Sequence, residues 1–352
     1  MDYMAFTKRG LLNAEFFITR ICNGKAGETM MIVGDEGTRS ETDLLSVCAK
    51  KLGLKPFVVD VSAYGISRFT PVDFEPIPAL KAAAQASDIC VTTCLGFAKI
   101  LGSAKEMDGI LTGQARCFAL WARNIWEWDF DFEEIMAMRR RTVKIRDLIK
   151  KAKILHFTTA KGTDLICKVG EKNMAAIYEV LAIVPFFGEV AIIPNSGTVN
   201  GVAVIDGAAT GYISGGGVRR DQFGQREIGM EPIRLEIKDG KVVDYSAAPL
   251  HKARLEEFLH KTEVLADQVD EIGIVTTTAD ISDEYQWRMW DDGSHHSRSF
   301  HIALGNNTSE RKEIIHAKAH CDFDIHDPVI ELDGHVIYRD GRFDDEWIDN
   351  HA

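Results

Sequence analysis

The hydrophobic pattern of this chain changes near residue 150, and this change restricts the folds that it can adopt. Before that point, short apolar runs alternate with segments of helical periodicity. The runs that we predict as strands are 28–37, 56–61, 88–94 and 115–121, and the predicted helices are 38–52 and 77–87. Alternation of strands with helices is typical of a parallel sheet covered by helices. We therefore expect the first half to be an α/β domain.

The second half follows a long amphipathic helix, predicted at about 133–152, and its strands come in hairpin-like pairs. Apolar and polar residues alternate, pass through a turn and alternate again in 154–170, 189–213 and 232–246. Asp239 and Gly240 form a strong hairpin signal in the last of these. A helix at about 250–268 and a strand at 271–277 follow. We therefore predict two domains, an α/β domain over 1–152 and an α+β domain with an antiparallel sheet over 153–352.

Length and charge exclude several classes of protein. The chain has 352 residues, which favours two domains, and its 41 basic and 53 acidic residues give a net charge of −12. A nucleic-acid binder needs a basic surface, and only 139–153 is basic; a solvated helix face is the preferred interpretation of that run. We therefore expect no nucleic-acid partner.

Membrane and export signals are missing from the sequence. No uncharged apolar run approaches the roughly 20 residues that span a bilayer. The first ten residues, MDYMAFTKRG, lack the layout of a signal peptide. The seven cysteines form no regular framework, which indicates buried free thiols in a reducing compartment. We therefore expect a cytoplasmic protein without a membrane partner.

Histidines and acidic residues gather near the C-terminus, and seven of the eleven histidines lie between positions 295 and 335. His320 and Asp322 occupy alternate positions of a β-like segment, so their side chains would project from one face. His301 begins another candidate strand, and Glu189 and Glu271 stand at strand starts. Two histidines and three carboxylates would suit two divalent metal ions that share a bridging carboxylate and a water. Exposed acids and surface histidines in hairpins are the alternative interpretation.

Five segments taken together resemble the successive signatures of the thermophilic leucyl aminopeptidase (aminopeptidase T) family. They are IRDLIKKAKILHFTTAKGTDL (145–165), FGEVAIIPNSGTVNG (187–201), DEIGIVTT (270–277), HIALG (301–305) and HCDFDIHDPVIELDG (320–334). The resemblance implies an aminopeptidase T-like fold, with an N-terminal α/β domain, a C-terminal metal-binding catalytic domain and a homodimer. The dinuclear metal ligands that it implies are Glu189, Glu271, His301, His320 and Asp322. The ions would be zinc, cobalt or manganese.

The chain also resembles a second branch of this scaffold, the 2,5-dihydroxypyridine 5,6-dioxygenases. These enzymes cleave an aromatic ring with O2 at one ferrous ion. His301, His320 and Asp322 would complete a two-histidine, one-carboxylate triad for such an ion. The tyrosine that aminopeptidases carry after the ALG turn has no counterpart at 306–308, and this stretch resembles the dioxygenases more. The position of the third iron ligand aligns with Glu271. Because both glutamates are kept, the hydrolase is the preferred interpretation.

The expected activity is hydrolysis of an amide or peptide bond in a small-molecule substrate by a metal-activated water. Glu271 or Asp322 would be the bridging carboxylate and take part in catalysis, while the sequence identifies no general base. His295 and His296 are candidates for the substrate pocket, and Arg219 for binding a substrate carboxylate. The alternatives are the mononuclear Fe(II) dioxygenase and a non-catalytic, metal-free binding scaffold.

Overall fold

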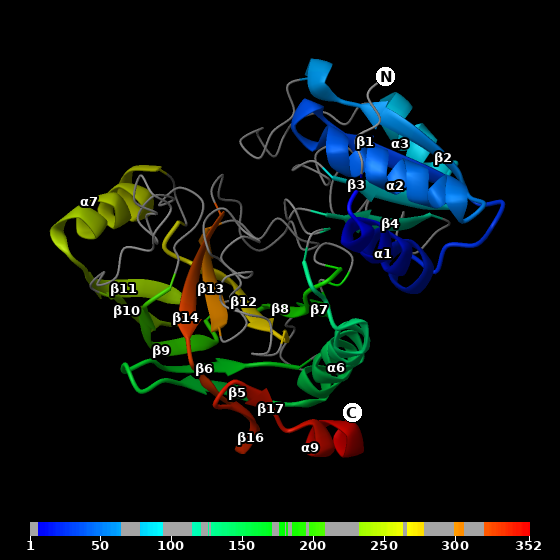
Figure 1. Ribbon diagram of the computed structural model, residues 1–352. Coiled ribbons are helices and arrows are strands. Elements are labelled where there is room, and N and C mark those ends of the chain that lie inside the picture. Colours follow the sequence, from blue (N-terminus) through cyan, green and yellow to red (C-terminus); the bar gives the residue numbers. More distant parts are fainter. Residues whose placement is uncertain are drawn as a thin grey trace. The chain divides into compact units, whose positions relative to one another are not determined.

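Figure 1 shows the computed structural model of the chain. The chain divides into two compact units, and each is described by itself. Unit 1 comprises residues 1–135 and 181–186, and unit 2 comprises 136–180 and 187–352. The structure describes residues 6–64, 78–93, 115–120, 126, 128–170, 176–179, 181, 185–194, 197–207, 232–262, 266–277, 299–305 and 320–352.

Unit 1 is built on sheet A, whose four strands are all parallel and lie in the order β2-β1-β3-β4. The strands are β1 (Thr29–Gly34), β2 (Lys55–Asp60), β3 (Ile89–Thr92) and β4 (Arg116–Ala119). The helices of this unit include α1 (Lys8–Phe16), α2 (Arg39–Lys51) and α3 (Pro78–Gln85), and α2 packs on β1 and β2 (Figure 1). The buried strands β1 and β3 are apolar on both faces, as expected for a parallel sheet. The predicted α/β half is confirmed.

Unit 2 contains two antiparallel sheets. Sheet B has eight strands in the order β11-β10-β9-β6-β5-β15-β16-β17, and sheet C has five in the order β14-β13-β12-β8-β7. The strands of sheet B are β5 (Ile154–Thr158), β6 (Asp164–Lys168), β9 (Val199–Ile205), β10 (Ile233–Lys238), β11 (Lys241–Ser246), β15 (Val329–Leu332), β16 (His335–Arg339) and β17 (Arg342–Phe343). Those of sheet C are β7 (Ala176–Glu179), β8 (Glu189–Ile193), β12 (Val269–Val275), β13 (Ser299–Gly305) and β14 (His320–His326). The predicted antiparallel α+β half is confirmed.

One hydrophobic core joins the two sheets of unit 2. Alternate residues of most of their strands contribute to it, and the rings of Phe157 on β5 and Phe300 on β13 stack with centroids 4.2 Å apart. Helix α6 (Phe132–Lys151) adds Ile145, Leu148 and Ile149 to the same core. The apolar side of each sheet is therefore buried, and the other side of each carries its polar residues.

The hairpin predictions have different outcomes. Strands β5 and β6 pair as an antiparallel hairpin over 154–170, and β10 and β11 do the same around Asp239 and Gly240, which both have positive φ. The predicted hairpin over 189–213 is wrong. Strand β8 belongs to sheet C and β9 to sheet B, so the chain crosses between sheets at this point. The alternation of polar and apolar residues predicts a half-buried strand, but it does not indicate the strand with which that strand pairs.

The long helix α6 lies mostly in unit 2, whereas the predicted division at 152/153 assigns all of it to the N-terminal half. Its apolar face packs in the core of unit 2, which is why the contacts divide the chain before Met136. The returning segment 181–186 joins unit 1 because Phe186 stacks on Phe17 and Phe130. The division into domains at 152/153 stays a prediction.

The six described cysteines are all buried. Burial raises the pKa of the Cys48 thiol to about 11 and that of Cys167 to about 12, so both remain protonated at neutral pH. They behave as small apolar side chains and offer no thiolate to a metal. Among the described helices, none is long and apolar enough to cross a bilayer.

The stack of Phe157 on Phe300 joins sheets B and C, which leads to a test of the shared core. Phe157→Ala is expected to lower the free energy of unfolding by about 3–5 kcal/mol, because a fully buried ring leaves a cavity between the sheets. Urea denaturation followed by circular dichroism measures this loss. Val243→Ala, at a side chain that is 56% exposed, is the control and should change stability by less than about 0.5 kcal/mol. Equal losses in both variants would contradict a shared core.

Candidate metal centre

The polar side of sheet C carries four of the five predicted ligands. Val190, Ile272, Phe300 and Phe323 of four neighbouring strands point into the core. Successive side chains of a strand point to opposite faces, so the residues next to these four point away from the core. Those residues include Glu189 on β8, Glu271 on β12, His301 on β13 and Asp322 on β14.

The register of sheet C places these residues in neighbouring rows. One row runs across the strands from Ala191 through Gly273 and His301 to Asp324. The next row contains Glu271, Ala303 and Asp322, so that an alanine separates the two carboxylates. Opposed residues of an antiparallel pair lie about 5 Å apart. Small side chains therefore occupy the middle of the polar face, and larger polar ones surround them.

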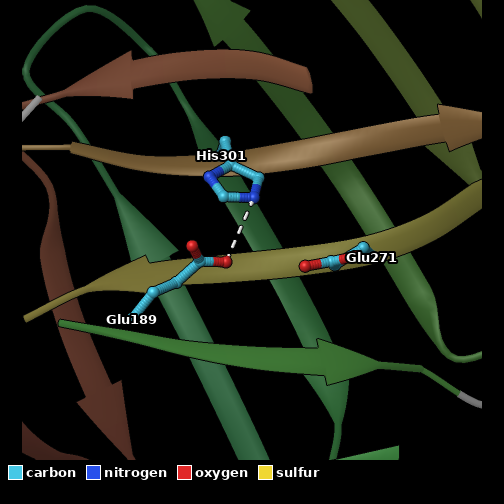
Figure 2. A group of neighbouring side chains, drawn as sticks. All are labelled: Glu189, Glu271 and His301. Carbon is cyan, nitrogen blue, oxygen red and sulfur yellow. Dashed lines mark ion pairs between the residues drawn. The ribbon is translucent and has the colours of Figure 1, made fainter. Parts of the chain in front are cut away.

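Three of the predicted ligands converge on one point. Figure 2 shows the imidazole of His301 and the carboxylates of Glu189 and Glu271 turned toward one another from three adjacent strands. One ligand atom of each lies within 4.8 Å of the other two. The Nε2 atom of His301 is 3.6 Å from Oε1 of Glu189. His301 is 1% exposed and Glu189 5%, whereas Glu271 is half-buried.

Gly273 makes room for the imidazole. It lies directly opposite His301 on the neighbouring strand, and a Cβ atom at this position would stand 2.0 Å from Cε1 and 2.2 Å from Nε2 of His301. Such distances are impossible for real atoms, so any larger residue would displace the ring. The ring passes over Gly273 from β13 toward Glu189 on β8, two strands away. The position of the histidine therefore depends on a glycine.

The other predicted site residues are described to different extents. Asp322 is half-buried and lies across Ala303 from Glu271, on the same face of sheet C. The backbone of His320 begins β14 opposite Gly305, and its side chain lies outside the described residues. The three predicted substrate-binding residues, Arg219, His295 and His296, also lie outside the described residues.

Sequence reasoning missed two residues of this face. Asp324 is fully buried and lies directly opposite His301, and Gly273 supports the imidazole. The signal for Asp324 was present, because it continues the alternation that begins with His320 and Asp322. Nothing in the sequence distinguishes Gly273 from other glycines, since its role follows from the pairing of β12 with β13.

Comparison with known proteins places this arrangement in a family. The sequence model of the 2,5-dihydroxypyridine 5,6-dioxygenase (NicX) family matches residues 14–345. No curated protein sequence matches the chain.

Two solved structures share the fold. A 2,5-dihydroxypyridine dioxygenase from Pseudomonas putida KT2440 superimposes with a TM-score of 0.69 at 17% identity, over 96% of this chain and 98% of that chain. The wild-type AmpT of Thermus thermophilus superimposes with a TM-score of 0.61 at 17% identity, over 97% of this chain and 100% of that chain. The predicted aminopeptidase T-like fold is therefore confirmed. Because the family model covers nearly the whole sequence, the chain belongs to the 2,5-dihydroxypyridine 5,6-dioxygenase (NicX) family within this aminopeptidase T-like group.

Proposed function

We propose that the protein is a metal-dependent hydrolase that cleaves an amide or peptide bond in a small substrate. The observation that carries the proposal is the convergence of Glu189, Glu271 and His301 within 4.8 Å, with Asp322 across Ala303 on the same face. A catalytic metal ion with an open position typically has three protein ligands. The site offers four, namely two carboxylates and an imidazole at one point and a third carboxylate nearby.

The geometry of these residues fits a divalent cation. Ligand atoms about 2.1 Å from a tetrahedral ion lie about 3.5 Å from each other, and Nε2 of His301 and Oε1 of Glu189 are 3.6 Å apart. Carboxylate and imidazole are ligands of zinc, cobalt and manganese. Repulsion between Glu189 and Glu271, brought together at partly buried positions, is a cost that a cation would offset.

The proposed ligands divide between two ions. Glu189 and His301 would hold one, His320 and Asp322 the other, and Glu271 or Asp322 would bridge them. When bound, the two cations supply a water of pKa about 7 as nucleophile and polarise the substrate carbonyl.

Burial around the site indicates how a substrate would reach it. His301 and Glu189 are almost completely buried, whereas Glu271 and Asp322 are half-buried. The substrate would therefore approach from the row of Glu271 and Asp322, and proton exchange with the reacting groups would fall to these carboxylates. His295, His296 and Arg219 are proposed to line this approach, and a homodimer remains a prediction.

A second candidate is a mononuclear Fe(II) dioxygenase that cleaves an aromatic ring. The match to the dioxygenase family supports it, and His301, His320 and Asp322 provide the donor types of a two-histidine, one-carboxylate triad. In that case Glu189 and Glu271 would stand beside the iron without being required as ligands. A non-catalytic, metal-free scaffold is the third possibility.

Metal content after purification without oxygen separates these functions. Hydrolysis predicts two zinc, cobalt or manganese ions per chain, measured by elemental analysis, and release of amines from small amide substrates. One iron per chain with O2 consumption would establish ring cleavage instead. A chain that retains no metal and takes up none on titration would contradict both enzymes.

Glu271→Gln is expected to abolish turnover and to weaken binding of the added cation by at least 10-fold, because the amide keeps the shape but loses the charge. Isothermal titration of the metal-free protein measures the affinity. Glu331→Gln, at a half-buried glutamate on β15 of sheet B, is the matched control and should bind like the wild type. Full activity and affinity in Glu271→Gln would overturn the ligand assignment.

Gly273→Ala is expected to weaken cation binding about 10- to 100-fold, because the new methyl group would displace the His301 imidazole. The same titration reports the loss. Gly37→Ala, whose Cβ atom would have its nearest neighbour at 3.3 Å, introduces the same chemical change in unit 1 and should leave binding intact. Wild-type affinity in Gly273→Ala would show that His301 is no ligand.

A further inference from the structure

The backbone just before Glu189 is tightly packed at Gly188. A Cβ atom on Gly188 would stand 2.0 Å from Oγ1 of Thr276, 2.3 Å from Sδ of Met138 and 2.5 Å from Oγ1 of Thr142. Met138 and Thr142 belong to α6, and Thr276 directly follows β12. Helix α6 and the end of β12 therefore enclose the residue that precedes a proposed ligand.

Hydrogen bonds hold the end of β12 to the same backbone. The carbonyl of Gly188 accepts from the amide of Thr276 at 2.7 Å, and the amide of Gly188 donates to Oγ1 of Thr277 at 3.2 Å. Val275, which precedes Thr276, is the register partner of Glu189. Movement at Thr276 would therefore be transmitted to the start of β8.

A pair of buried hydroxyl groups connects this point to α6. Oγ1 of Thr142 and Oγ1 of Thr276 are 2.7 Å apart, and both residues are fully buried. The Thr142 hydroxyl donates to the carbonyl of Met138 at 2.8 Å, which leaves its lone pairs for the proton of the Thr276 hydroxyl. Both hydroxyls are therefore satisfied in one orientation, and this orientation holds Thr276 in place.

The C-terminal helix α9 (Asp345–His351) supports the same point through Arg141. The guanidinium of Arg141 donates two hydrogen bonds to the Asp345 carboxylate, at 2.6 and 2.8 Å, and its Nη1 atom donates to the carbonyl of Thr276 at 3.4 Å. A two-point contact of this kind fixes the plane of the guanidinium. Arg141 is 8% exposed, so little water competes for it.

We propose that Thr142 and Thr276 are positioning residues, whose paired hydroxyls hold Gly188 and thereby place the Glu189 carboxylate for metal binding. Neither touches the proposed ions. The inference rests on the proposed metal site. It adds to that site a set of hydrogen bonds that connects the end of β12 in sheet C to α6 and to the C-terminal helix α9. Hydrogen-bonded groups behind metal ligands commonly set metal affinity in this way.

Thr142→Val tests the proposal, because valine keeps the shape and removes the hydroxyl. Titration of the metal-free protein with Zn2+ or Co2+ should show 10- to 100-fold weaker binding in this variant, with an altered visible spectrum of the cobalt form. Thr142→Ser, which restores the hydroxyl, should return the affinity to within a few-fold of the wild type. Thermal unfolding in the absence of metal shows whether each variant is folded.

Thr163→Val is the matched control. Thr163 is another buried threonine of unit 2, and its hydroxyl makes two hydrogen bonds to the backbone of Val204. Val204 lies on β9 of sheet B, whereas the proposed ligands lie on sheet C. It should lose stability but keep wild-type metal affinity. If Thr142→Val does not fold, Thr276→Val removes the other hydroxyl of the pair, with the same expected loss.

The outcomes separate this inference from the proposed function. Wild-type affinity in a folded Thr142→Val or Thr276→Val, with weak binding in Glu189→Gln, would overturn the positioning role and leave the metal site intact. Equal losses in Thr142→Val and Thr163→Val would also overturn it, because they would indicate a general effect of stability. A wild-type protein that binds neither cation would overturn the proposed function and the inference together.

Discussion

The burial of one face of sheet C against sheet B is the constraint on which the candidate site depends. The residues that fill the shared core, such as Ile272, Phe300 and Phe323, alternate strictly with their neighbours along each strand. Slippage of any strand by one residue would expose these side chains and bury carboxylates in the core. The same apolar packing that stabilises unit 2 therefore determines which side chains gather on the opposite face.

Small residues on that face are the second requirement. Gly273 and Ala303 weaken a strand, since they bury little surface, and glycine also costs conformational entropy. They leave the space in which His301 leans over β12 and in which Glu271 and Asp322 face each other across one alanine. The apolar face must therefore compensate for the stability that the polar face lacks, and its large fully buried phenylalanines do so.

The sequence was sufficient to predict the two halves of the fold and to place four of the five predicted ligands on one face of a sheet, because both follow from local periodicity. It was not sufficient to predict which strands become neighbours. The turn chemistry of Asp239 and Gly240 identifies a hairpin, whereas the strands on either side of 194–198 join different sheets, which no local signal reports. The contributions of Gly273 and of the pair Thr142 and Thr276 depend on contacts between residues far apart in sequence.

Membership of a dioxygenase family establishes the scaffold more firmly than the chemistry, because the reaction depends on the donors that the scaffold displays. Glu189, Glu271 and Asp322 bring three carboxylates to one face, and Asp324 adds a fourth beside His301. A single ferrous ion carries two positive charges and would balance half of this negative charge. Two divalent cations carry four, which balances the carboxylates and reduces the cost of burying them. The charge on the polar face of sheet C is therefore an argument for the dinuclear hydrolase that we propose, whereas the family match supports the proposed dioxygenase.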